Sequence, residues 1–302
     1  MHRENLSLWA LARRWGFALL WATLPFTAGP ALADSLDSRS TLFRSATSVG
    51  LWTVWAITLG VALVPRTVSL TILRIVAPAA TATIIWSAIV TPSLGVDDLV
   101  ALVVSAVATA VMFAPAVGDE YVNGSSYGDE RRFPLRAPGA LLLGPIEVTW
   151  VLVVAGVVAG PLLLAAQAWI AGGIALAVGW PVAWFGTRSL HMLARRWLVL
   201  TPAGVVLHDQ LSVVEAMLVL RRQVAAIRPA LVDSPARDLT QGAPGLALEL
   251  ITVDPLPISL TPVRHLRQRG TVVSEDITAV LFTPSRPGVV LREAAARRLP
   301  VG

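Results

Sequence analysis

The sequence predicts an α-helical polytopic membrane domain with five or six transmembrane helices, followed by a small cytoplasmic β-rich (α+β) domain closed by a helix. The first observation is composition: 55% of the 302 residues are hydrophobic and 14% are charged, whereas soluble domains carry about a quarter charged residues. Mean hydropathy is +0.68. The second observation is the order of segments along the chain: long uncharged runs come before residue 187, and short β-like runs begin at residue 197.

Residues 1–33 are either a cleaved secretory signal peptide or the first transmembrane helix. Arg3, Arg13 and Arg14 give a basic start, an uncharged run follows, and Ala31-Leu32-Ala33 precedes Asp34. A basic start, an apolar core and an A-x-A ending are typical of a signal peptide. Both alternatives place Asp34 on the outer face.

Residues 34–117 are expected to hold three transmembrane helices, at about 48–64, 70–90 and 99–117. Trp52, Trp55 and Trp86 lie where interfacial aromatic residues are expected. Pro92 and Gly95 predict a tight outer turn between the second and third of these helices.

After a predicted cytoplasmic loop, residues 118–139, the segment 140–187 is expected to form a transmembrane hairpin. Its helices are predicted at about 148–166 and 169–185. Gly156 and Gly160 form a G-x-x-x-G motif, which lets helix backbones approach closely. The motif predicts packing inside the hairpin, with a homo-oligomer through the same two glycines as the alternative.

Glu147 is a candidate acid at membrane depth, because apolar residues flank it on both sides. If the helix begins near Ala140, the carboxylate lies several residues deep, where such groups are usually functional. If the helix begins near Val148, Glu147 is an N-terminal acid at the inner interface, beside Trp150, favoured by the helix dipole. The pair Gly144-Pro145 suits a helix start. The Gly-Pro pair favours the interface.

The arginine distribution predicts the orientation. The sequence contains no lysine, and by this topology two arginines, Arg39 and Arg44, lie in outer segments. The inner segments up to residue 196 contain eleven arginines: 3, 13, 14, 66, 74, 131, 132, 136, 188, 195 and 196. By the positive-inside rule, the chain is a multi-pass protein of the inner (plasma) membrane with a cytoplasmic C-terminus.

Residues 188–302 are expected to be the β-rich domain, and residues 190–302 to fold alone. A helix is predicted from Pro287 to Leu299. The predicted strands are 197–200, 205–207, 216–220, 224–227, 246–253, 258–260, 271–273 and 279–283. Short strands closed by one helix predict a small curved sheet or barrel.

This order of elements resembles that of bacterial pleckstrin-homology-like domains. The resemblance rests on the hairpin at Leu198–His208, the strand at Val280–Phe282 and the helix at Pro287–Leu299. The layout with NGSSYG followed by ERRFPLRAP also resembles uncharacterised multi-pass membrane proteins of mycobacteria and related actinobacteria. That resemblance implies a location in the cell envelope and no particular activity.

The charged loop holds the first candidate site. Asp119, Glu120, Asp129 and Glu130 could hold Mg²⁺ against a phosphate bound by Arg131 and Arg132, or acids and arginines could simply neutralise each other. Gly124–Gly128 fits G-x-S-x-G, but a nucleophile elbow needs a preceding strand, and a transmembrane helix is predicted there instead. No catalytic residue, metal ligand or cofactor is therefore assigned.

The predicted partners follow from charge. Residues 188–302 contain fourteen arginines and nine acids, so this domain should be drawn to anionic head groups of the bilayer. Arg188, Arg195 and Arg196 are the candidate head-group contacts. A protein partner of unknown identity is also expected, and no motif indicates nucleic acid.

The function that fits these features best is a non-enzymatic membrane scaffold or adaptor of the cell envelope. It would present its cytoplasmic domain to lipid head groups or to a protein partner. A transport or export component is the first alternative, although no charged residue lies at the middle of a predicted span. A membrane enzyme acting on a lipid-linked phosphate is the second.

Overall fold

A computed structural model describes residues 8–91, 95–261 and 273–302 and the side chains of all of these except 8–14 and 273. The chain divides into two compact units. The helical unit comprises Met1–Gly124 and Val148–His191, and the β unit comprises Ser125–Glu147 and Met192–Gly302. The basic start at Arg3, the turn at Pro92 and the run 271–272 lie outside the described residues.

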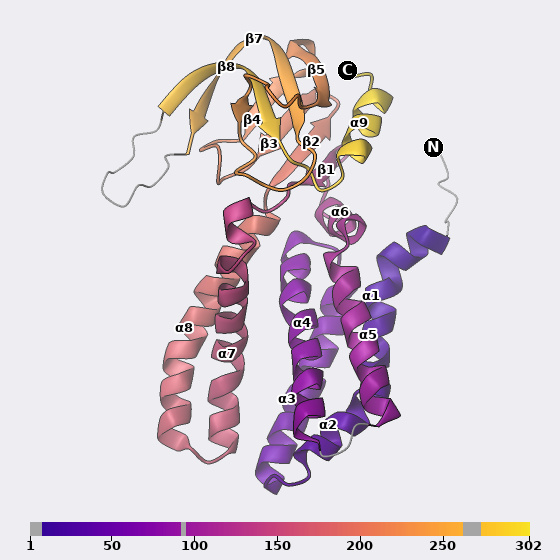
Figure 1. The fold of residues 1–302 in the computed structure, drawn as a ribbon, viewed down its shortest axis with the longest axis vertical. Coiled ribbons are helices and arrows are strands. Elements are labelled where there is room, and N and C mark those ends of the chain that lie inside the picture. The colour runs from indigo at the N-terminus through magenta and orange to yellow at the C-terminus, as the bar shows by residue number, and fades with distance from the viewer. Residues whose placement is uncertain (1–7, 92–94, 262–272) are drawn as a thin grey trace. The chain divides into compact units, whose positions relative to one another are not determined.

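In the helical unit, five helices are long and apolar enough to cross a membrane, which indicates a multi-pass membrane protein. A sixth span results if the bent pair α1–α2 is counted as one, with a 42° bend between its halves. The helices of this unit are α1 Leu8–Thr27, α2 Gly29–Leu36, α3 Thr41–Ala62, α4 Thr67–Val90, α5 Val96–Phe113, α6 Pro115–Asn123, α7 Pro145–Ala165 and α8 Trp169–Ala194 (Figure 1).

The helix starts follow local capping chemistry. Ser40 caps α3 by accepting a hydrogen bond from the Phe43 amide (3.4 Å). The Asp98 carboxylate accepts from the Gly95 amide (2.8 Å) at the start of α5. The helix predicted over 99–117 ends instead at Phe113, because Pro115 starts the separate helix α6.

Helix α4 packs against α3 and α5, and α1 packs against α5. Two reciprocal hydrogen bonds join α1 to α3: each indole Nε1 of Trp21 and Trp55 donates to the other residue's carbonyl at 3.0 Å. These bonds satisfy both indole donors inside an otherwise apolar contact.

Helices α7 and α8 form the predicted hairpin (Figure 1). A Cβ on Gly156 or on Gly179 would collide with the carbonyl oxygen of the other glycine, so the backbones meet there. Gly160 packs equally closely on Leu176. Both glycines of the G-x-x-x-G motif thus face α8 of the same chain.

The β unit contains two four-stranded sheets, with strand orders β1-β2-β3-β4 and β5-β7-β8-β6. All pairings are antiparallel except β6 with β8. The elements are β1 Arg131–Pro134, β2 Trp197–Thr201, β3 Gly204–His208, β4 Met217–Leu220, β5 Val224–Pro229, β6 Arg237–Asp238, β7 Leu248–Leu260, β8 Val273–Phe282 and α9 Pro287–Ala296.

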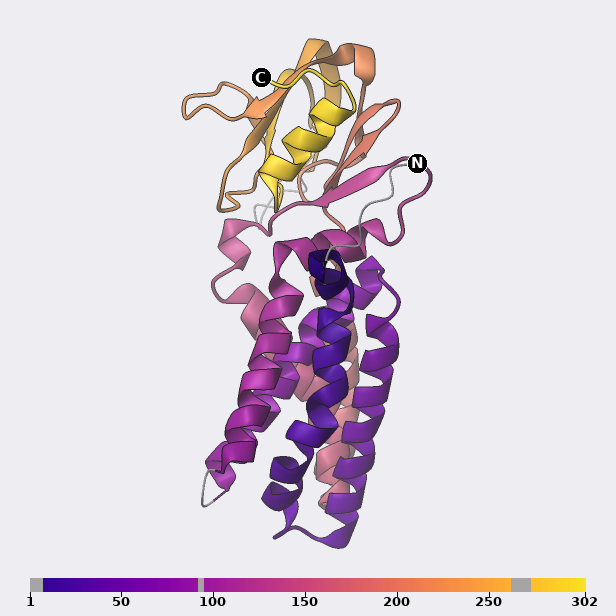
Figure 2. The same ribbon diagram turned by 90° about the vertical axis from the view of Figure 1, so that its right-hand side faces the viewer.

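One core joins the two sheets and the last helix. Leu198 and Val205 of the first sheet, Ile227 and Leu248 of the second, and Val290 of α9 are all fully buried in one hydrophobic cluster. Helix α9 lies across the sheets (Figure 2). The predicted β-rich region closed by a helix is therefore present.

Strand β1 lies outside the expected β-rich domain, residues 188–302, because it comes from the charged loop 118–139. Its residues pair with β2 in the register Arg131↔Leu200 to Pro134↔Trp197, and Phe133 is buried in the shared core. The β unit is thus built from two separate stretches of chain, with α7–α8 inserted between them. A four-residue strand flanked by charges has no repeating pattern that sequence reading could detect.

Candidate functional sites

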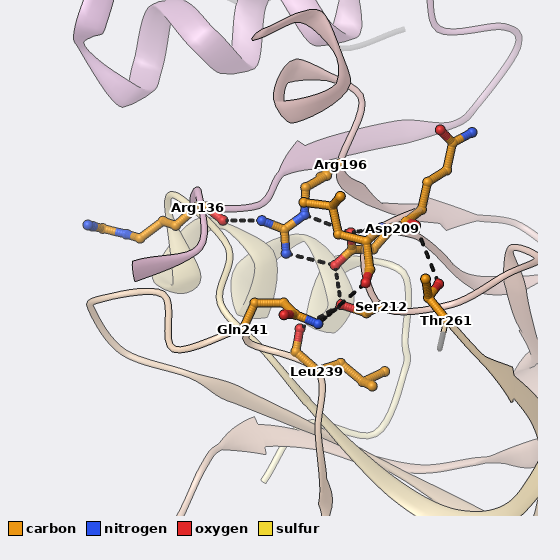
Figure 3. A network of polar contacts seen from close by, with 9 residues as sticks. Arg136, Arg196, Asp209, Ser212, Leu239, Gln241 and Thr261 are labelled. Carbon is orange, nitrogen blue, oxygen red and sulfur yellow. Dashed lines mark hydrogen bonds and ion pairs between the residues drawn. The ribbon is translucent and has the colours of Figure 1, made fainter. Parts of the chain in front are cut away.

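A buried ion pair joins Arg196, between α8 and β2, to Asp209, directly after β3 (Figure 3). The guanidinium donates from Nε to Oδ1 and from Nη2 to Oδ2, both at 2.7 Å. The side chains are 2% and 1% exposed. This bidentate geometry is the strongest form of an arginine–carboxylate contact.

The pair is part of a larger polar network (Figure 3). Asp209 also accepts from the Leu211 amide (3.1 Å) and the Ser212 hydroxyl (2.8 Å), and Gln241 Nε2 donates to Ser212 Oγ (3.2 Å). Arg196 Nη1 donates to the Arg136 carbonyl (2.8 Å). Because Arg136 precedes α7 and Arg196 follows α8, the network fastens together the two chain segments that flank the inserted hairpin.

The network is fully hydrogen-bonded, so it stabilises the fold and offers no reactive group. Both Asp209 oxygens already accept two hydrogen bonds, which leaves neither poised as a general base. Asp209 was not among the residues predicted from the sequence. Its signal is the Asx turn with the Leu211 amide, a pattern typical of Asp after a strand.

A second candidate site, the arginine hollow, lies on the β unit and has a volume of about 480 Å³. Its lining is Ala203, Leu220, Arg221, Arg222, Arg298 and Pro300. All three arginines are solvent-exposed, and none of the lining residues is acidic. Such a site presents concentrated positive charge to an anion.

The three arginines of the hollow differ in their contacts. Arg221 Nη2 donates to the carbonyls of Arg297 (2.5 Å) and Arg298 (3.1 Å), which fixes it at the end of α9. The guanidinium groups of Arg222 and Arg298 form no hydrogen bond or ion pair with any residue in the described ranges. The guanidinium donors of Arg222 and Arg298 are therefore available to bind phosphate oxygens.

The predicted loop site is divided between the two units. Asp119 and Glu120 lie on α6 of the helical unit, and the Asp119 residue is 3% exposed. The other four residues, Asp129 to Arg132, belong to the β unit.

Within the β unit, the loop residues pair with one another or with α9. Glu130 Oε1 accepts from Arg132 Nη2 at 2.6 Å, and Asp129 pairs with Arg297 at 3.4 Å. Arg131 lies over the Phe133 ring. Among the described residues, no group of three His, Asp or Glu side chains could hold a metal ion.

Glu147 lies in the first turn of α7, which begins at Pro145. Its carboxylate is exposed and accepts from the Gly144 amide at 2.8 Å. The acid thus satisfies a helix N-terminus, and the helix begins between the two predicted starts, Ala140 and Val148.

The three predicted head-group arginines have different surroundings. Arg188 is exposed on α8, Arg195 is half-buried, and Arg196 is buried in the Asp209 pair. Arg196 therefore does not fit the predicted role, because its donors already bind protein acceptors. An arginine after an apolar helix gives no sequence signal that distinguishes a surface from a buried position.

The histidines and the G-x-S-x-G motif show no catalytic arrangement in the described residues. His191 Nδ1 bonds the Thr71 hydroxyl at 2.9 Å in the helical unit, whereas His208 stacks on Trp197 in the β unit. The motif follows helix α6 and not a strand. His2 and His265 lie outside the described residues.

Among the described residues outside the candidate spans, three groups have shifted pKa values. Burial, assisted by Arg195, lowers the pKa of His208, so its ring is neutral at pH 7. Burial alone would raise the pKa of Glu249, but hydrogen bonds from Ser234 and Arg228 hold it below its ordinary value. Burial, with Glu120 nearby, raises the pKa of Tyr121 to about 12.

Comparison with family models, with curated proteins and with solved structures finds no match for this chain. The resemblances to actinobacterial membrane proteins and to pleckstrin-homology-like domains therefore stay predictions, and function must be argued from the site geometry alone.

Proposed function

We propose that this protein is an integral membrane scaffold or adaptor whose β unit binds anionic lipid head groups through the arginine hollow. The proposal places it in the inner (plasma) membrane with the β unit in the cytoplasm. The observation that carries it is the hollow itself, where Arg222 and Arg298 have no hydrogen-bond or ion-pair partner among the described residues and Arg221 is held by the end of α9.

Energetics support this role. An exposed cation without an ion-pair partner gains no ion-pair energy within the fold, but near an anionic membrane surface each arginine contributes about 1 kcal/mol of binding. The C-terminal excess of arginine over acid adds attraction of the same sign.

The test uses the full chain in nanodiscs of neutral phosphatidylcholine, to which vesicles of phosphatidylcholine with or without phosphatidylglycerol are added. The β unit should bind the anionic vesicles, and the binding should weaken as salt is raised. A double variant with glutamine at both Arg222 and Arg298 should bind the anionic vesicles roughly thirtyfold more weakly. This factor corresponds to a loss of about 1 kcal/mol for each arginine.

The matched control removes the same charge elsewhere on the β unit. Arg237 and Arg292 are exposed and lie outside the hollow, so their double glutamine variant should retain nearly all binding. If both double variants lost the same amount of binding, net charge alone would explain the binding, and a defined site would be refuted. Absence of anionic binding in the unmodified chain would refute the proposal as a whole.

A transport or export component is the second candidate, favoured by one observation. The bent pair α1–α2 lines a cavity in the helical unit, and broken helices often form binding sites in transporters. Solute uptake into liposomes containing the purified chain would favour transport over a scaffold. The loop residues expected of a phosphate enzyme are divided between two units and give no support to that alternative.

A further inference from the structure

The helical unit contains a second hollow, the helical cavity, with a volume of about 820 Å³. This volume falls within the range of roughly 300–1,000 Å³ that is usual for small-molecule sites. Its walls come from α3, α4, α7 and the break between α1 and α2. All of these belong to one unit, so the cavity is independent of the arginine hollow.

The length of the cavity matches one leaflet of a bilayer. Along α3 its lining runs from Thr41 to Trp55, which at about 1.5 Å per residue is roughly 21 Å. Half the thickness of a bilayer, head groups included, is also about 20–22 Å. A molecule that fills the cavity along α3 would thus have the length of one lipid.

Polarity changes along the cavity as it does along a lipid. The first turns of α3 contribute Arg44, Ser45 and Ser48, whereas α7 contributes the apolar side chains of Val154 and Val158. The polar end is at the start of a candidate span, where head groups lie, and the apolar end is where acyl chains lie.

Among the described residues that line this cavity, Arg44 is the only charged one. It pairs with Asp37 at 3.4 Å, but the two side chains remain 51% and 67% exposed, so the contact is weak and open to a second anion. An anionic head group at this position would gain a net attraction to Arg44, which in a zwitterionic head group is partly cancelled by the quaternary ammonium.

The break between α1 and α2 keeps the cavity open. Ala28 and Gly29 line it, and a Cβ built on Gly29 would meet no atom within 4 Å. Interrupted helices at membrane depth are tolerated where the break is buried in protein or lines a cavity, so the bend and the cavity are parts of one feature.

We propose that the helical cavity binds one anionic membrane lipid, with its acyl chain between α3, α4 and α7 and its head group at Arg44. The inference does not depend on the scaffold function or on which membrane face is cytoplasmic. It concerns the leaflet that contains the start of α3.

Native mass spectrometry of the full chain in detergent tests this directly, with added phosphatidylglycerol or phosphatidylcholine of identical acyl chains. The unmodified chain should retain one lipid and prefer phosphatidylglycerol roughly fivefold, the effect of one favourable charge contact. Ala80 lines the cavity, so Ala80→Phe should reduce retention several-fold.

Two further variants make the result specific. Ala82 is exposed on the same helix and does not line the cavity, so Ala82→Phe should retain lipid normally. Arg44→Gln, at an exposed position, should keep the lipid and lose the preference for phosphatidylglycerol. Equal retention in Ala80→Phe and Ala82→Phe, or an unchanged preference in Arg44→Gln, would overturn the proposal and leave only non-specific surrounding lipid.

Discussion

At the scale of single residues, burial determines which arginines can act outside the fold. Arg196 and Arg298 have the same side chain, yet Arg196 is 2% exposed and hydrogen-bonds Asp209 and Arg136 inside the β unit, while Arg298 lines the arginine hollow. A buried charge must be paired to be tolerated, whereas an exposed unpaired one is available to a ligand.

The Arg196–Asp209 pair makes a prediction at this scale. Asp209→Ala would leave the Arg196 guanidinium buried without its carboxylate, which should cost about 3–5 kcal/mol of unfolding free energy. The loss of stability is measured by heating the full chain in detergent and using limited proteolysis to monitor unfolding of the β unit.

Asp233→Ala serves as the control, because Asp233 is exposed and should change stability little. Replacing both partners, Arg196→Met with Asp209→Leu, should recover much of the loss, since no unpaired charge remains. If Asp209→Ala melts like Asp233→Ala, the pair is not structurally important.

At the scale of elements, β1 is the strand on which the integrity of the β unit depends. It comes from before the α7–α8 hairpin, pairs with β2 and buries Phe133 to 1% exposure. Without it, β2 becomes an exposed edge and the core loses an aromatic side chain. This changes the expectation that residues 190–302 fold alone.

We now expect residues 190–302 to show no cooperative melt, whereas residues 125–138 joined to 192–302 by a flexible linker should fold. Circular dichroism of the two fragments compares them. In the full chain, Phe133→Ala should cost about 3–5 kcal/mol, while Tyr127→Ala, at a side chain that is 90% exposed, should cost little. A cooperative melt of the tail alone would show that β1 is dispensable.

At the scale of the whole molecule, the paired strands constrain the topology. Because Arg131–Pro134 and Trp197–Thr201 form one ladder, the residues before α7 and after α8 must lie on the same side of the membrane. The hairpin then crosses an even number of times. The arginine bias supplies the separate prediction that this side is cytoplasmic.

Single-cysteine labelling tests both statements, and the chain has no native cysteine to interfere. Cysteines at the exposed residues Tyr127 and Val232 should react with an impermeant reagent only after the cells are opened. Cysteines at Ser38 and Gln167, in the turns at the opposite ends of their helices, should react in intact cells. Labelling of only one of the two positions, Tyr127 or Val232, in intact cells would contradict the β1–β2 pairing. Labelling of both in intact cells would show that the predicted orientation is the wrong way round.

The sequence by itself determined the five apolar helices, the hairpin, the strands around Trp197–His208 and the final helix at Pro287. These features depend on local hydrophobic runs and on turn and capping residues, which can be read along the chain. Gly144-Pro145 was likewise predicted as a helix start, and α7 begins at Pro145. The depth of Glu147 in a membrane stays a prediction.

Only the tertiary structure decided which distant residues meet. Four features join segments that are separated along the chain: the pairing of β1 with β2, the contact of Arg196 with Asp209, the arginine hollow and the helical cavity. An arginine or a four-residue strand has the same local sequence pattern whether it is buried or exposed. Its role is set by packing against remote elements, through the desolvation and pairing that such packing imposes.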